Sequence, residues 1–133
     1  MKNLLITSFW IGIIADALAT VLLFSPAIAN IVFQPQPFAM SAIYLYVTRV
    51  AGALMFGWTV LLFWAVQKPI ERSDILLITI VPVVTLLAVA AVFFAKSNQI
   101  PTSNLFPMFI LYFVLFCTYI PSYIWAKKQK VQS

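Results

Sequence analysis

The sequence has little of what soluble enzymes use for chemistry. Its 133 residues include no histidine, one cysteine, three glycines and three acidic residues. Without histidine, the chain lacks the ligands of bis-histidine haem and most zinc sites, and the commonest general base. The single Cys117 excludes an intramolecular disulfide and a CxxC thiol relay. We therefore expect a protein that is not an enzyme and that holds no metal or cofactor.

Charged residues are also scarce, and long apolar stretches take their place. Charged residues make up 8% and hydrophobic residues 64% of the chain, whereas a soluble domain carries roughly a quarter charged residues. Stretches of about twenty apolar residues are long enough to cross a bilayer core of about 30 Å at about 1.5 Å per residue. Four such spans are predicted, at about 4–24, 41–66, 75–95 and 105–126.

Short connections between consecutive helices favour antiparallel neighbours. The sequence therefore predicts an all-α integral membrane protein, a four-transmembrane-helix antiparallel bundle that forms one domain over residues 1–133. The first connection, residues 26–40, is longer and rich in proline, and we expect a short helix at 27–33.

Basic residues in short loops stay in the cytoplasm. Lys96 lies alone on one side of the predicted spans, and six basic residues lie on the other, namely Lys2, Lys68, Arg72, Lys127, Lys128 and Lys130. This asymmetry predicts cytoplasmic N- and C-termini in a bacterial-type inner membrane or a plasma membrane. The basic residues form no patch of the kind that binds nucleic acid.

Two charged residues interrupt the apolar spans. Asp16 precedes Ser25, at the outer end of the first span, by nine residues, and Arg49 follows the start of the second by eight. These counts correspond to about 14 Å and about 12 Å of helix, so equal depths are expected. An unpaired charge at mid-bilayer costs about 2.5–3.5 kcal/mol on insertion scales, which predicts that the two face each other.

Hydroxyl groups and small residues accompany this pair. Counted from the same side, Thr85 and Tyr112 reach a similar depth, and each has a hydroxyl that can bond to an ion pair. We predict an intramembrane polar layer made by Asp16, Arg49, Thr85 and Tyr112. Small residues allow two helices to approach closely in lipid, and we expect this packing at Gly12, Ala19, Gly52 and Gly57.

The polar layer has two interpretations. In the first, it handles a small molecule, a lipid or an ion, with Asp16 binding a cation or proton for which Arg49 competes. In the second, the protein is a structural or accessory membrane subunit, and Asp16 and Arg49 form a buried salt bridge that fixes helix pairing. The partners that either interpretation allows are membrane lipid, a small hydrophobic or cationic ligand, further copies of the chain and other membrane subunits.

The first span also carries a family resemblance. Ala15-Asp16 with Thr20 and Leu22 resembles the first helix of small multidrug-resistance transporters, which are four-span chains of similar size with one acidic residue there. The resemblance implies an antiparallel dimer that exchanges protons for cationic drugs at Asp16. This chain has aspartate where that family has glutamate, and it adds Arg49 as a counter-charge.

Two prolines fall inside the later spans. Pro82 lacks the donor that would bond the carbonyl of Ile78, and Pro121 has the same effect on Cys117. The sequence therefore predicts that both helices bend near these prolines.

Overall fold

The computed structural model describes residues 1–33, 42–97 and 102–132, and within these ranges it contains helices and turns but no strand. Four helical segments are long and apolar enough to cross a membrane, namely Lys2–Phe24, Ala42–Val66, Asp74–Lys96 and Thr102–Gln132. The prediction of an all-helical chain with four such segments is confirmed. Residues 34–40 of the first connection, and the predicted start of the second span at residue 41, lie outside the described residues.

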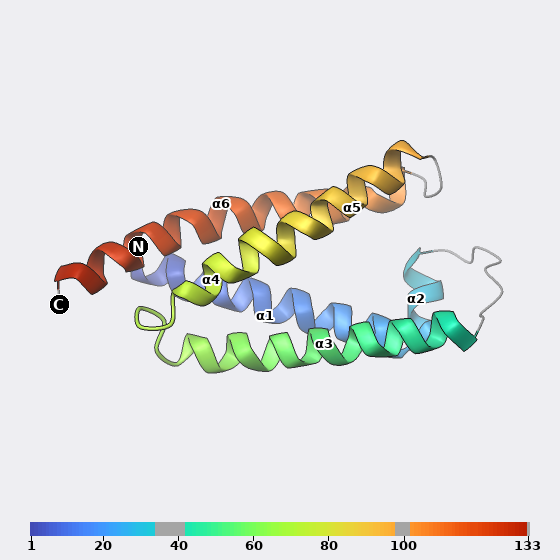
Figure 1. Cartoon of the computed structure of the whole chain (residues 1–133), viewed down its shortest axis with the longest axis horizontal. Coiled ribbons are helices and arrows are strands. Elements are labelled where there is room, and N and C mark those ends of the chain that lie inside the picture. Colours follow the sequence, from blue (N-terminus) through green and yellow to red (C-terminus); the bar gives the residue numbers. More distant parts are fainter. Residues whose placement is uncertain (34–41, 98–101, 133) are drawn as a thin grey trace. The chain divides into compact units, whose positions relative to one another are not determined.

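Figure 1 shows the elements in chain order. Helix α1 (Lys2–Phe24) is followed closely by the short helix α2 (Pro26–Phe33), which agrees with the helix expected at 27–33. The second long helix is α3 and the last is α6, while the third is divided into α4, η1 and α5. Their bounds are Ala42–Val66 for α3, Asp74–Ile78 for α4, Thr79–Val84 for η1, Thr85–Lys96 for α5 and Thr102–Gln132 for α6.

The chain forms two compact units, which divide α1 between them. One unit is Gly12–Trp64, and the other combines Met1–Ile11 with Ala65–Ser133. The single domain expected from the sequence stays a prediction.

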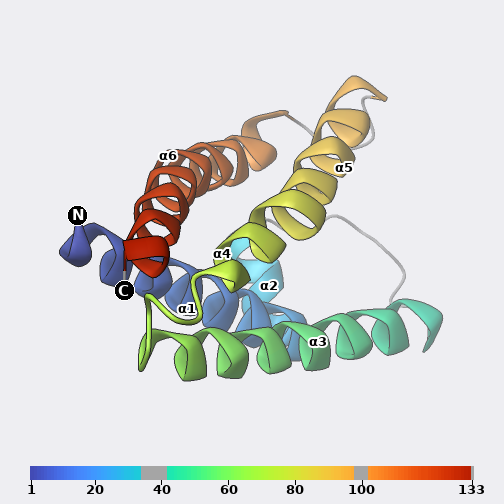
Figure 2. The same ribbon diagram turned by 60° about the vertical axis from the view of Figure 1, so that its left-hand side comes forward.

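Close contact between α1 and α3 organises the unit Gly12–Trp64. The two helices run side by side in opposite directions, as both Figure 1 and Figure 2 show. A Cβ built on Gly52 would lie 2.8 Å from Cε2 of Phe24 and 3.3 Å from Cβ of Leu23. Only a residue without a side chain fits this approach unless a neighbour moves, so Gly52 sets how far α3 is shifted along α1.

The other unit has its core where the first turns of α1 meet α4 and α6. The fully or almost fully buried apolar side chains include Leu5, Phe9, Leu76, Leu115, Tyr119 and Ala126. Ser8 is buried among them. Its Oγ lies 2.9 Å from Oγ of Ser122, and its one hydrogen has two carbonyl acceptors within reach, that of Leu4 in α1 at 2.8 Å and that of Thr118 in α6 at 3.2 Å. The contact between Ser8 and Ser122 joins α1 to α6 through polar groups.

The third long helix changes its hydrogen-bonding pattern around Pro82. Residues Thr79–Val84 are π-helical, with Pro82 inside this segment. Proline removes one backbone donor, and a wider turn is a common way to absorb the loss. The Thr85 hydroxyl also donates to the carbonyl of Ile80 at 2.9 Å. In contrast, α6 continues as α-helix through Pro121.

Two surface ion pairs lie in or beside the connection between α3 and α4. Lys68 Nζ lies 3.2 Å from Oε2 of Glu71, and Lys130 Nζ at the end of α6 lies 2.8 Å from Oδ2 of Asp74 at the start of α4. Exposed pairs of this kind contribute about 0–1 kcal/mol each. Only the Lys130–Asp74 pair joins two elements, the end of α6 and the start of α4.

Candidate functional site

Asp16 lies near the middle of α1. It is eight residues from Phe24 and fourteen from Lys2, which places it about 12 Å and about 21 Å from the two helix ends. The residue is half-buried. Within the ranges that the structure describes, its carboxylate forms no ion pair with a basic side chain. The structure therefore leaves an unneutralised acid in the centre of an apolar helix.

The nearest hydroxyl along the helix is already used. Thr20 Oγ1 donates to the backbone carbonyl of Asp16 at 2.8 Å. This is the usual bond from a threonine to the carbonyl four residues earlier. The bond occupies the hydroxyl hydrogen, which is then not available to the Asp16 carboxylate.

Arg49 lies at a different level from Asp16. Gly52 of α3 contacts Leu23 and Phe24 at the end of α1. Because α3 runs opposite to α1, the residues before Gly52 lie beyond the end of α1. Arg49 is three residues before Gly52, so it lies further from Asp16 than this contact does. Seven to eight residues separate Asp16 from the contact, so the two charges are offset by about 16 Å along the helix axes. Arg49 is exposed, and the two residues form no ion pair in the described part of the chain.

The equal depth and the ion pair expected from the sequence are therefore corrected. The depth count assumed that α1 and α3 end at the same level. Instead, α3 begins at Ala42, ten residues before Gly52, and so extends about 15 Å beyond the level at which α1 ends. Arg49 belongs to this extension.

A residue that the sequence reasoning missed lies at the level of Asp16. On α1, Asp16 lies seven to eight residues before the contact with Gly52. On α3, the residues seven and eight positions after Gly52 are Thr59 and Val60, so these two lie at the level of Asp16. Thr59 is half-buried, and its hydroxyl donates to the carbonyl of Met55 at 2.9 Å. The glycine at position 52 was the signal that could have aligned the two helices correctly.

The other two members of the predicted polar layer belong to the other unit. Thr85 is exposed at the start of α5 and bonds within its own helix, while Tyr112 is half-buried on α6. Asp16 and Arg49 belong to Gly12–Trp64 and these two do not. The joint layer of four residues stays a prediction.

The predicted helix-packing residues differ in their surroundings. Gly12 and Gly52 are buried and Ala19 is half-buried, whereas Gly57 is exposed. A Cβ built on Gly57 would meet nothing within 4 Å. Within this chain, close packing is therefore shown at Gly52 but not at Gly57, because Gly57 lies on a face of α3 that the described residues do not cover.

The chemistry available at this site is that of a carboxylate. Among the residues that the structure describes, no group of three His, Cys, Asp or Glu side chains could hold a metal ion. A lone carboxylate in apolar surroundings can bind a proton or an organic cation. No known protein family, curated protein or solved structure matches the chain.

Proposed function

We propose that this chain is an integral membrane protein whose four long helices cross the bilayer as an antiparallel bundle, with both termini in the cytoplasm. The lengths and apolar character of the helices support the membrane location. The basic residues support the orientation, because six lie on the side of the two termini and Lys96 lies on the other.

Within this arrangement, the protein binds a small cationic molecule or ion at Asp16. The observation that carries the proposal is a half-buried aspartate near the middle of α1 without an ion-pair partner among the described residues. An unpaired carboxylate near the bilayer centre costs about 2.5–3.5 kcal/mol, and a bound cation or proton removes this cost. Such a site favours a ligand that is both cationic and apolar.

Arg49 has a separate role in this proposal. Arg49 lies beyond the end of α1, close to the headgroup region of the bilayer. Long basic side chains near helix ends extend to that region, so its guanidinium reaches the headgroups. It therefore does not compete for the acid, and a cation at Asp16 does not have to displace it.

Binding of tetraphenylphosphonium, a lipophilic organic cation, to the protein purified in mild detergent tests this function. Equilibrium dialysis at pH 8 should detect binding that weakens at pH 5, because protons compete for the carboxylate. We expect Asp16→Asn to reduce affinity at least tenfold and Asp16→Glu to retain the dependence on pH. The matched control, Glu71→Gln, removes an acid that is exposed and paired with Lys68, and should bind like the wild type.

Two outcomes would contradict a cation site at Asp16. One is equal binding by the wild type and Asp16→Asn. The other is no binding by the wild type together with extraction of a stable complex with other membrane proteins, which would favour an accessory subunit.

The orientation is tested by labelling intact cells with a membrane-impermeant maleimide. Single cysteines replace Lys2, Lys96 or Lys128 in a Cys117→Ala background. Only the cysteine at position 96 should react without permeabilising the cells. Labelling at position 2 or 128 would contradict cytoplasmic termini.

A further inference from the structure

The end of α6 combines an apolar stripe with lysines on a helix that continues past its apolar part. The apolar stretch ends at Ala126, whereas α6 continues to Gln132, six residues or about 9 Å further. The lysines of this segment are therefore held on a helix. Lys130 is paired with Asp74, which leaves Lys127 and Lys128 exposed and without an ion pair in the described ranges.

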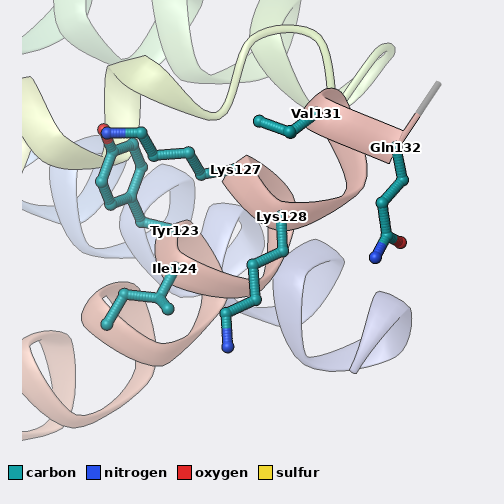
Figure 3. A pocket seen from close by; sticks show the side chains of 6 residues that line it. All are labelled: Tyr123, Ile124, Lys127, Lys128, Val131 and Gln132. Carbon is teal, nitrogen blue, oxygen red and sulfur yellow. The ribbon is translucent and has the colours of Figure 1, made fainter.

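A shallow depression of about 520 Å³ lies along this part of α6 (Figure 3). Lys127 and Lys128 line it together with Ile124 and Val131, and Tyr123 and Gln132 complete its wall. Residues three and four apart share one helix face, so Ile124, the two lysines and Val131 form one continuous strip. Two cations thus flank an apolar surface.

Tyr123 helps to position one of these cations. The Nζ of Lys127 lies 5.8 Å from the centre of the Tyr123 ring, within the range of an attraction between a cation and an aromatic face. Figure 3 shows the Lys127 side chain directed toward that ring and the Lys128 side chain directed away from it. The two ammonium groups therefore do not compete for one position, and an anion placed over the strip has a cation on each side.

The strip continues along α6 as an exposed apolar path. Ile120 and Phe113 precede Ile124 at spacings that keep them on the same helix face, and their side chains are 44% and 70% exposed. A molecule that fits the whole surface has an anionic group at Lys127 and Lys128 and a long apolar tail over Ile120 and Phe113. A free anion would leave the apolar path bare.

We propose that this face of α6, made of Phe113, Ile120, Ile124, Lys127 and Lys128, binds an anionic phospholipid, with the phosphate between the two lysines and an acyl chain along the apolar residues. The inference rests on the membrane location proposed above, but not on cation binding at Asp16. Juxtamembrane lysines attract anionic lipids electrostatically, and here the helix adds a specific surface for the rest of the molecule.

Lipid competition tests this site. The full chain, purified in mild detergent, is mixed with equal amounts of dioleoylphosphatidylglycerol and dioleoylphosphatidylcholine, and native mass spectrometry measures which lipid is retained. We expect the wild type to prefer phosphatidylglycerol at least tenfold. Lys127→Gln/Lys128→Gln should lose this preference, while Lys127→Arg/Lys128→Arg should keep it because both charges remain.

The matched control is Lys2→Gln/Lys96→Gln, which lowers the net charge equally at other helix ends and should retain the preference. Equal retention by the control and by Lys127→Gln/Lys128→Gln would overturn the proposal. So would loss of the preference on adding inorganic phosphate, because that result would indicate a site for free phosphate. Lys127→Gln/Lys128→Gln should bind tetraphenylphosphonium like the wild type. This measurement distinguishes a failure of the lipid site on α6 from a failure of the cation site at Asp16.

Discussion

Gly52 in α3 lies so close to the ring of Phe24 in α1 that a Cβ at this position would be 2.8 Å from a ring carbon. The contact determines the level of every residue of α3 relative to α1. It separates Arg49 from Asp16 and brings Thr59 to the level of the acid. The consequences of this one close approach can be measured.

The first prediction concerns the close approach itself. Replacing glycine by alanine inside a helix normally stabilises by about 1 kcal/mol, and this gain is expected for Gly57→Ala, where a Cβ meets nothing within 4 Å. At Gly52 the same change overpacks the contact with Phe24, at a cost of about 1–3 kcal/mol. Gly52→Ala should therefore have a lower melting temperature in detergent than Gly57→Ala. Equal melting temperatures would contradict this tight contact, either because the exposed Phe24 ring moves aside without cost or because α1 and α3 do not meet at Gly52.

The second prediction concerns the two charges inside the helices. Because Asp16 and Arg49 are offset along the helix axes and form no ion pair in the described chain, their mutational effects should be additive. The stabilities of Asp16→Asn, Arg49→Gln and the double variant should give a coupling energy below about 0.5 kcal/mol. A coupling well above this value, with the double variant more stable than either single one, would restore the salt bridge.

The third prediction concerns the buried hydroxyl pair between α1 and α6. Ser8→Ala leaves the hydroxyl of Ser122 without its partner 2.9 Å away, and an unsatisfied buried polar group costs about 1–3 kcal/mol. Thermal unfolding in detergent should show this loss, and Ser8→Ala/Ser122→Ala should cost less than the sum of the single changes. Ser103→Ala, at an exposed serine of α6, is the control and should unfold like the wild type. Additive effects of the two buried substitutions would contradict the direct bond.

The fourth prediction concerns Thr85. Its hydroxyl donates to the carbonyl of Ile80 within the π-helical part of the third long helix, and its side chain is exposed. Thr85→Val keeps the shape and removes the hydroxyl, so we expect less than a twofold change in tetraphenylphosphonium affinity, measured by equilibrium dialysis. A loss as large as that of Asp16→Asn would instead place Thr85 in the ligand site, as the polar layer predicted from the sequence requires.

Much of the local structure could be predicted from the sequence. Apolar runs of sufficient length predicted four helices, and the short helix inside the proline-rich first connection was also expected, because both depend on neighbouring residues. At Pro82 the sequence predicted a bend because proline removes a backbone donor, whereas the π-helical segment around it was seen only in the structure. The isolated acid at position 16 was also evident, because no other formal charge lies in that apolar run.

The sequence alone determined that this chain has four long apolar helices with one acid inside the first. The tertiary structure decided which residues share a level with that acid. Counting residues from the predicted helix ends placed Arg49 beside Asp16, because such a count treats neighbouring helices as if they ended together. Packing of Gly52 against Phe24 shifts α3 along α1 instead. The reason is steric: the side chains of two neighbouring helices must fit together, and this fit fixes their relative shift. Counting residues along one helix cannot predict that shift.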